Sequence, residues 1–442
     1  MQYRFTPNLW LRFFIYQFLF VCLAAATAFA QTEPAAILLT WQQDPSTTIS
    51  IDWHTLPESE ALETLSYRCK GKSEWQTVRA QSFPFPYSDR RIHRMELTGL
   101  DPDSNYEFRV GEFQRVYSFR TLPARNDRPL RFAAGGDTSH GDLFRRMNRA
   151  VMRYDPDFIV WGGDLAYANG NKENVDLWYQ WFDGIRETLI SEEGRVVPVI
   201  VGLGNHDVIN HHYPASESNI DKGIGMPAFI ASVKRGEMAE PTDSMRLEKA
   251  PFFYPLFAFP GQPGYGVLDI GNYLSLIILD SSHSNLISGS QTDWLKKTLQ
   301  DRQDRPHLIP VYHKPAYPSG RVEPGGKRVQ FWSEEVLDNW IPLFEEYAVR
   351  VALENDDHTY KRSYPVKNNA IRPNGIVYLG DGSWGVEKKK PKTPEEVWYL
   401  SKSAEENSAI IVTLQGSHQH FLMINENGKI IDEYPETLKI TP

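Results

Sequence analysis

Residues 158–167 read Phe-Ile-Val-Trp-Gly-Gly-Asp-Leu-Ala-Tyr and point to the fold class of this 442-residue chain. The first four residues are an apolar run that predicts a buried strand. The strand stops at a glycine pair, after which come the carboxylate of Asp164 and the phenol of Tyr167. In open α/β sheets, ligands bind at the carboxyl ends of the strands. Taken alone, the stretch fits a strand-terminating turn equally well, since Gly-Asp is common turn chemistry.

The same arrangement recurs after four other apolar runs. Metal-ligand side chains follow these runs at Asp137, at 204–207 (Gly-Asn-His-Asp), at His313 and at 355–358 (Asn-Asp-Asp-His). Each has a simpler interpretation by itself. Asp137 suits a helix cap, Asn205 suits a turn, and a lone histidine at 313 or 358 is more often an ordinary half-buried imidazole. Five such placements at consecutive strand ends predict one shared site.

Beyond residue 130 the pattern alternates between strands and helices, which predicts an α/β domain. The expected strands are 130–134, 158–161, 197–201, 274–279, 308–312 and 349–353, with further strands at 376–379, 409–414, 421–424 and 429–434. Apolar residues at helical spacing predict helices over 143–151 and 177–185 and others that start near 291 and 333. Between 210 and 266 the pattern lapses, which predicts a lid or binding insertion at the mouth of the site.

Residues 36–121 predict an all-β sandwich. Short strands are expected at 36–41, 48–53, 93–97, 106–110 and 116–121, with turn signals between them. The segment 100–106 resembles the tyrosine corner of fibronectin type III domains, in which a Tyr hydroxyl bonds to the upstream backbone. We expect this sandwich to be a spacer or packing partner, since it carries no evident chemistry.

The first 30 residues have the pattern of a secretory signal peptide. Arg4 and Arg12 are the only charged residues there, an apolar run covers 13–26, and Ala28-Phe29-Ala30 is a small-x-small cleavage pattern. A retained membrane anchor is the alternative, which the short apolar run disfavours. We therefore expect a secreted or periplasmic protein without an integral membrane segment after cleavage.

Composition limits the classes of function. The chain is 41% hydrophobic and 23% charged, with a formal net charge of -9. A general nucleic-acid binder would instead carry a basic face. Cys22 lies in the signal segment, so Cys69 would be alone in the mature chain. With no disulfide partner, we expect core packing and bound metal to hold the protein together.

The predicted domain organisation follows from these patterns. It places a signal peptide at 1–30, a fibronectin type III-like β-sandwich at 31–123, a linker at 124–129 and a catalytic domain at 130–435, whose C-terminal strands occupy 376–435.

The order of these motifs resembles the purple acid phosphatases, which belong to the calcineurin-like metallophosphoesterases. The resemblance rests on Gly-Asp at 136–137, Gly-Asp-x-x-Tyr at 163–167, Gly-Asn-His-Asp at 204–207, the strand-ending His313 and a paired site that ends at His358. The family also places a β-sandwich before its catalytic domain. The resemblance implies an α/β sandwich of two β-sheets flanked by helices, and a hydrolase that acts on phosphate esters.

By position, the resemblance implies two metal ions. It assigns Asp137, Tyr167 and His358 to Fe(III), Asp164 to a bridge between the ions, and Asn205, His313 and Asp356 to a divalent ion (Zn, Mn or Fe). His206 would be catalytic, and Asn205 and His206 would contact the substrate.

The chemistry of the donors agrees with this assignment, since a hard trivalent ion prefers anionic oxygen ligands, and imidazole and amide suit a divalent neighbour. Two metals about 3.5–4 Å apart stabilise the attacking and leaving oxygens, and a metal lowers the pKa of bound water to about 7, which supplies the attacking hydroxide. A cationic His206 would stabilise the transition state or protonate the leaving alkoxide.

The chain departs from the family pattern at three places. Asp356 stands where the family has an imidazole, which shifts the expected preference of the second site toward harder ions such as manganese or magnesium. Pro310 replaces the usual valine before the strand-ending histidine, and no histidine follows within about ten residues of His313.

We therefore expect a phosphate monoesterase that acts on small molecules, without nucleic-acid binding beyond a role as substrate. A phosphodiesterase or nucleotidase with the same centre is one alternative. A non-catalytic extracellular binding protein with a degenerate site is the other, which Asp356 favours and the remaining ligands disfavour.

Overall fold

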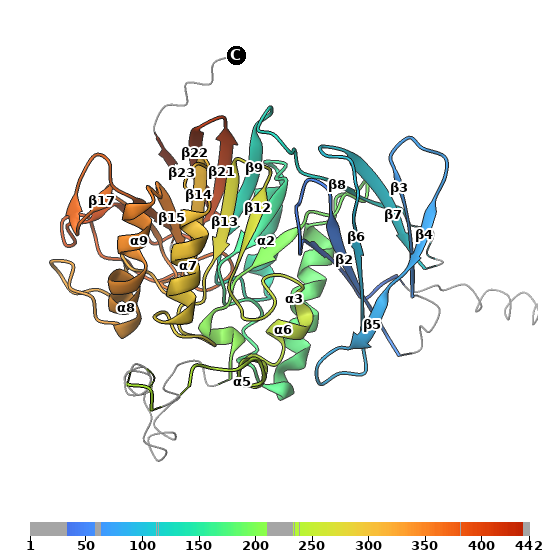
Figure 1. Ribbon diagram of the computed structural model, residues 1–442, viewed down its shortest axis with the longest axis horizontal. Coiled ribbons are helices and arrows are strands. Elements are labelled where there is room, and N and C mark those ends of the chain that lie inside the picture. Colours follow the sequence, from blue (N-terminus) through green and yellow to red (C-terminus); the bar gives the residue numbers. More distant parts are fainter. Residues whose placement is uncertain are drawn as a thin grey trace, which may run out of the picture. The chain divides into compact units, whose positions relative to one another are not determined.

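The computed structural model describes residues 33–57, 63–111, 113, 115–209, 233, 235–237, 239–380 and 382–435. The described residues from Ala35 onward belong to one unit, whose helices and strands are labelled in Figure 1. The expected signal peptide and the first part of the expected insertion at 210–266 lie outside the described residues and stay predictions. None of the helices in the described ranges is long and apolar enough to cross a membrane.

The N-terminal part is an all-β sandwich, as predicted. Its first sheet has the order β1-β2-β6-β5 and its second the order β4-β3-β7-β8, and all pairs in them are antiparallel. The strands are β1 (Ala36–Thr40), β2 (Ile49–Thr55), β3 (Thr64–Cys69), β4 (Gln76–Arg79), β5 (Gln81–Pro84), β6 (Arg91–Leu97), β7 (Asn105–Val110) and β8 (Tyr117–Arg120). The tyrosine corner is present, because the backbone N–H of Asp101 donates to the Tyr106 hydroxyl at 2.9 Å.

The rest of the described chain builds two mixed sheets. The first has the order β11-β10-β9-β21-β22-β23 and the second the order β12-β13-β14-β15-β19-β16-β20, with a separate hairpin β17-β18. The strands of the first sheet are β9 (Leu130–Gly135), β10 (Phe158–Trp161), β11 (Val199–Val201), β21 (Ala409–Gln415), β22 (His418–Ile424) and β23 (Ile430–Tyr434). Those of the second are β12 (Gly266–Ile270), β13 (Leu274–Ile278), β14 (His307–Val311), β15 (Val351–Glu354), β16 (Tyr360–Ser363), β19 (Val377–Gly380) and β20 (Leu400–Ala404); β17 (Val366–Lys367) and β18 (Ala370–Ile371) form the hairpin.

The central strands β10, β13 and β14 are buried along their whole length, which explains their largely apolar sequences. In β9 and β10, Phe132 and Phe158 stack on each other and share a core cluster with Ile309 and Val311 of the second sheet. The alternate residues Ala133 and Ile159 belong to a different cluster, on the outer face of the first sheet. The period-two alternation of each strand therefore separates an inner layer from an outer one.

Helices cover the outer face of each sheet. The helices are α2 (Asp142–Met152), α3 (Val175–Thr188), α5 (Asp243–Lys249), α6 (Phe253–Leu256), α7 (Ser290–Gln300), α8 (Phe331–Asn339) and α9 (Ile341–Glu346), with 3-10 turns η1 (Lys172–Asn174) and η2 (Asn205–Asp207). Phe144 of α2 and Trp181 of α3 pack on the first sheet. Leu295 of α7 and Phe344 of α9 pack on the second (Figure 1). The result is the predicted α/β sandwich of two sheets flanked by helices.

Candidate metal centre

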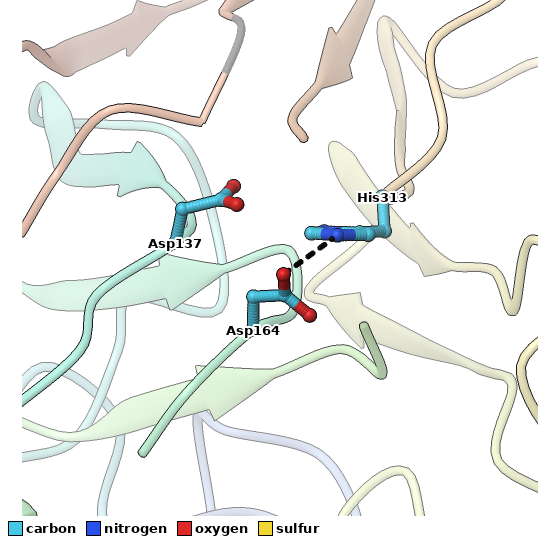
Figure 2. A group of neighbouring side chains, drawn as sticks. All are labelled: Asp137, Asp164 and His313. Atoms are coloured by element: carbon cyan, nitrogen blue, oxygen red, sulfur yellow. Dashed lines mark ion pairs between the residues drawn. The ribbon is translucent and has the colours of Figure 1, made fainter. Parts of the chain in front are cut away.

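The predicted ligands follow parallel strands of both sheets. Asp137 and Asp164 lie just after β9 and β10, which pair in parallel in the first sheet, and His313 lies just after β14 in the second. Figure 2 shows these three side chains converging from different strands. One ligand atom from each lies within 4.8 Å of the others, and all three residues are buried. The carboxyl ends of the two sheets thus meet at one cluster of metal-type side chains.

Asp137, Tyr167 and His358 form the first group of donors. The Tyr167 hydroxyl lies 3.2 Å from Asp137 Oδ1 and 3.3 Å from His358 Nε2. His358 Nε2 lies 3.1 Å from the same Asp137 oxygen. The other oxygen, Oδ2, accepts a hydrogen bond from the backbone N–H of Asp356 at 3.0 Å. A phenol, a carboxylate and an imidazole therefore present one atom each to a common point.

The first group fits a hard metal ion. Its donors are the ones that such an ion selects. Beside them, Asp164 Oδ2 is buried and, among the described residues, has only imidazole nitrogens as ion-pair partners, with His313 Nε2 at 3.3 Å and His206 Nε2 at 3.9 Å. A buried carboxylate is costly unless cations or donors serve it, so a metal ion would be well placed here. Burial, followed by the charge of Asp137, holds the pKa of Tyr167 well above its ordinary value, so its phenolate would need a bound cation.

The backbone at these donors is unusual. Five of the seven predicted ligands have positive φ: Asp137 (57°), Asp164 (55°), Tyr167 (60°), Asp356 (83°) and His358 (59°). The left-handed region costs a residue with a side chain roughly 1–2 kcal/mol. Such conformations cluster where function over-determines the backbone. Their concentration here marks the strand ends as a site rather than a set of simple turns.

Asp207 holds the Asp164 loop in place. Its Oδ2 accepts from the backbone N–H groups of Asp164 (2.9 Å) and Gly204 (2.8 Å), and its Oδ1 accepts from Leu165 (2.9 Å). Burial and the nearby charge of Asp164 raise the pKa of Asp207 to about 7. Gly204 is required there, because a Cβ would lie 2.2 Å from the Asp164 backbone nitrogen. The Gly-Asn-His-Asp motif therefore positions Asp164 as well as supplying Asn205 and His206.

His206 lies at the edge of the cluster. Its ring stacks on Tyr167 with centroids 4.1 Å apart, and its Nδ1 lies 2.7 Å from Asn169 Oδ1. Its backbone N–H donates to Asp164 Oδ1 at 2.6 Å, and its Nε2 lies 3.9 Å from Asp164 Oδ2. The side chain is 23% exposed while that of Asp164 is 1% exposed, so His206 can meet a ligand that enters from solvent.

Asn205, His313 and Asp356 form the second group. His313 Nε2 lies 3.2 Å from Asn205 Oδ1, 3.3 Å from Asp164 Oδ2 and 3.5 Å from Asp356 Oδ1. His313 Nδ1 donates to the carbonyl of Gly162 at 3.2 Å. That bond fixes the tautomer and orients Nε2 toward the oxygens, as is common for metal-ligating histidines.

The charges of His313 and of the neighbouring Asp164 shift each other's pKa. Burial would lower the pKa of His313, but the carboxylates of Asp164 and Asp137 outweigh burial and raise it. Burial likewise opposes ionisation of Asp164, but the charges of His313 and His206 hold its pKa well below the ordinary value.

Two cations that the sequence analysis did not assign contact Asp356. The Lys314 ammonium lies 2.7 Å from Asn205 Oδ1 and forms an ion pair with Asp356 Oδ1. The Arg321 guanidinium forms an ion pair with Asp356 Oδ2. Lys314 is fully buried, and burial, then the charge of Arg321, lowers its pKa to about 7. Lys314 directly follows the predicted ligand His313, so its place near the site could have been predicted from the sequence. Arg321 lies in a loop, and nothing in the sequence indicated that it is near the site.

A two-sheet α/β sandwich with this cluster at its strand ends defines the class of metal-dependent phosphoesterases. Comparisons with known proteins agree. A model of the calcineurin-like phosphoesterases matches residues 130–359, more than half of the chain, so the chain belongs to this family. A model of the purple acid phosphatase N-terminal domain matches residues 34–121.

Several similar proteins are purple acid phosphatases or acid phosphatases. Purple acid phosphatase 21 of Arabidopsis thaliana is 26% identical over 319 residues, which is 70% of this chain but only 63% of the plant protein. Human acid phosphatase type 7 is 24% identical over 80% of this chain and 81% of its own length. The purple acid phosphatase PPD1 of yellow lupin (Lupinus luteus) has the same fold, with a TM-score of 0.67 and 18% identity over 90% of this chain and 73% of the lupin chain.

Proposed function

We propose that this chain is a secreted or periplasmic acid phosphatase-like enzyme that hydrolyses phosphate monoesters of small molecules in a metal-dependent reaction. The observation that carries the proposal is the convergence of Asp137, Asp164, Tyr167 and His358 at buried strand ends. Family membership supports phosphoester chemistry, and the pattern of residues 1–30 supports export.

Asp137, Tyr167 and His358 of the first group, together with Asp164, would hold the metal ion, expected to be ferric iron. When bound there, the ion supplies Lewis acidity toward the phosphoryl group and lowers the pKa of water. The second, divalent ion implied by the family would rest on Asn205, His313 and Asp356. The first group can accept an ion without rearrangement. In the second group, however, three oxygens (Asn205 Oδ1 and both carboxylate oxygens of Asp356) already contact Lys314 or Arg321.

The chain's own residues do the remaining work. His206, oriented by Asn169 and stacked on Tyr167, is placed to contact the phosphate and to hold the proton that the leaving alkoxide takes up. Lys314 and Arg321 add positive charge beside the same cluster, which stabilises a phosphate dianion. Burial of Asp137 and Asp164 excludes water around the ligands and strengthens these interactions.

The test compares p-nitrophenyl phosphate with bis(p-nitrophenyl) phosphate, using metal-loaded and metal-depleted protein. We expect metal-dependent turnover that favours the monoester, with Asp164→Asn reduced to the metal-depleted rate. Preference for the bis-ester would support a phosphodiesterase with the same centre. Metal-independent or absent turnover would contradict the proposal and favour the binding-protein alternative.

A further inference from the structure

Asp356 stands in the second group of ligands, yet both of its carboxylate oxygens are used by cations of the chain itself. Lys314 binds Oδ1 and Arg321 binds Oδ2. Asp356 is 1% exposed and Lys314 is 1% exposed, so solvent does not screen this contact. One negative and two positive side chains thus occupy the place where the family has a neutral imidazole.

Lys314 also uses the second ligand of this group. Its ammonium donates to Asn205 Oδ1 at 2.7 Å. Since metal–oxygen bonds are about 2.0–2.2 Å long, an ion on that oxygen would lie at most about 5 Å from the ammonium. Two positive charges at that separation in a buried site repel strongly, because little water lies between them.

The first group has no such competitor. Among the described residues, no lysine or arginine forms an ion pair with Asp137 or Asp164; their ion-pair partners are histidines. The backbone N–H of Asp356 also supports Asp137, so this position contributes to the first group through its main chain. The two halves of the cluster therefore differ in charge.

We propose that this chain holds a single metal ion, in the first group, and that Lys314 and Arg321 supply the positive charge that a second ion gives in the family. The proposal rests on the proposed function, since it concerns the same site. It makes Lys314 a buried positive charge that excludes a second cation. Asp356 then positions both cations and ligates no metal.

The experiment counts bound metal per chain by elemental analysis, after reconstitution of the full chain with ferric iron and manganese in excess. Wild type is expected to hold one equivalent. Lys314→Met, which keeps an unbranched apolar side chain, is expected to take up a second equivalent, because Asn205 and Asp356 lose the ammonium. Arg321→Met, whose side chain is partly exposed, should raise manganese affinity in the same direction with less risk to folding.

Lys389→Met is the matched control. Lys389 carries the same charge and its backbone N–H donates to the carbonyl of His358 at 2.8 Å, but its ammonium forms no ion pair with Asp356 among the described residues. This variant should stay at one equivalent.

The number of bound metal ions distinguishes the single-ion proposal from the proposed function. Two equivalents in wild type would overturn the single-ion proposal and leave the proposed function intact. No bound metal in wild type would contradict both the single-ion proposal and the proposed function. A wild type with one equivalent, together with Lys314→Met and Arg321→Met variants that fold and gain no manganese, would show that these cations do not exclude the second ion.

Discussion

The Tyr167 hydroxyl lies 3.2 Å from Asp137 Oδ1 and, with His358, completes a group of three donors around one point. If ferric iron binds there, the phenolate gives a charge-transfer band in the visible that carboxylate, amide and imidazole ligands do not give. The iron-loaded, oxidised protein should be violet to pink, and Tyr167→Phe should be colourless with its fold retained. An absorption spectrum of both proteins at equal iron content checks this. An unchanged band in the Phe variant would contradict the tyrosinate.

Gly382 makes room for the first group. It has φ of +66°, and a Cβ there would lie 1.9 Å from Asp137 Oδ2. Gly382→Ala should displace the carboxylate and lower metal affinity by about 10–100-fold, in the range seen when support for a ligand is lost. A metal-binding titration measures the change. Gly416→Ala is the control. The φ angle there is +56°, so the variant has the same kind of backbone strain, but nothing lies within 4 Å of the added carbon and no ligand is displaced.

His206 is predicted to act on the substrate rather than on the metal. His206→Ala should lower kcat by about 10²–10⁴-fold, the usual contribution of a positioned acid or base, with metal content unchanged. Asn169→Ala, which removes the partner of Nδ1, should give a smaller loss and a changed pH profile of kcat. Loss of metal in His206→Ala would instead place His206 among the ligands.

Acid should weaken the sandwich through His54. Burial lowers the pKa of His54 to about 3, against an ordinary value of 6.5, and its Nδ1 has no hydrogen-bond partner. A histidine that stays neutral in the folded state costs stability as soon as the unfolded chain takes up its proton. The resulting loss in the free energy of unfolding is absent above pH 6.5 and grows as the pH falls toward 3. It reaches about 3 kcal/mol near pH 4.5.

Chemical denaturation of wild type and His54→Gln at pH 7.5 and 4.5 tests this. The variant should lose less stability between the two pH values than wild type, although burial of the amide lowers its stability at pH 7.5. Equal losses in the two proteins would show that His54 does not govern the acid sensitivity.

The sequence predicted the strands best where burial alone determines the pattern of apolar residues. Buried parallel strands such as β10 and β14 are apolar throughout and end at polar residues, so their positions were visible without coordinates. In the sandwich β3, β4 and β5 were missed, because apart from Leu65 none of their residues is buried. The predicted ligand residues do meet at one place, while the identity of the metals and each residue's role stay predictions.

The ion pairs of Asp356 could not be predicted from the sequence. Lys314 and Asp356 are 42 residues apart, and their contact depends on the parallel register of β14 and β15. The substitution of a carboxylate for the family's imidazole was visible, and it was interpreted as a change of metal preference. The positions of Lys314 and Arg321 in the structure suggest instead that the Asp356 carboxylate forms ion pairs with these two side chains.

The central claim is that catalysis depends on an ion held by Asp137, Asp164, Tyr167 and His358, and a titration of metal-depleted protein with ferric iron tests it most directly. Hydrolysis of p-nitrophenyl phosphate and bound iron are followed together at each addition, under excess manganese. The account predicts that activity and the visible band rise in proportion and reach a plateau together at one iron per chain. Full activity before any iron binds, or no activity at the plateau, would contradict it.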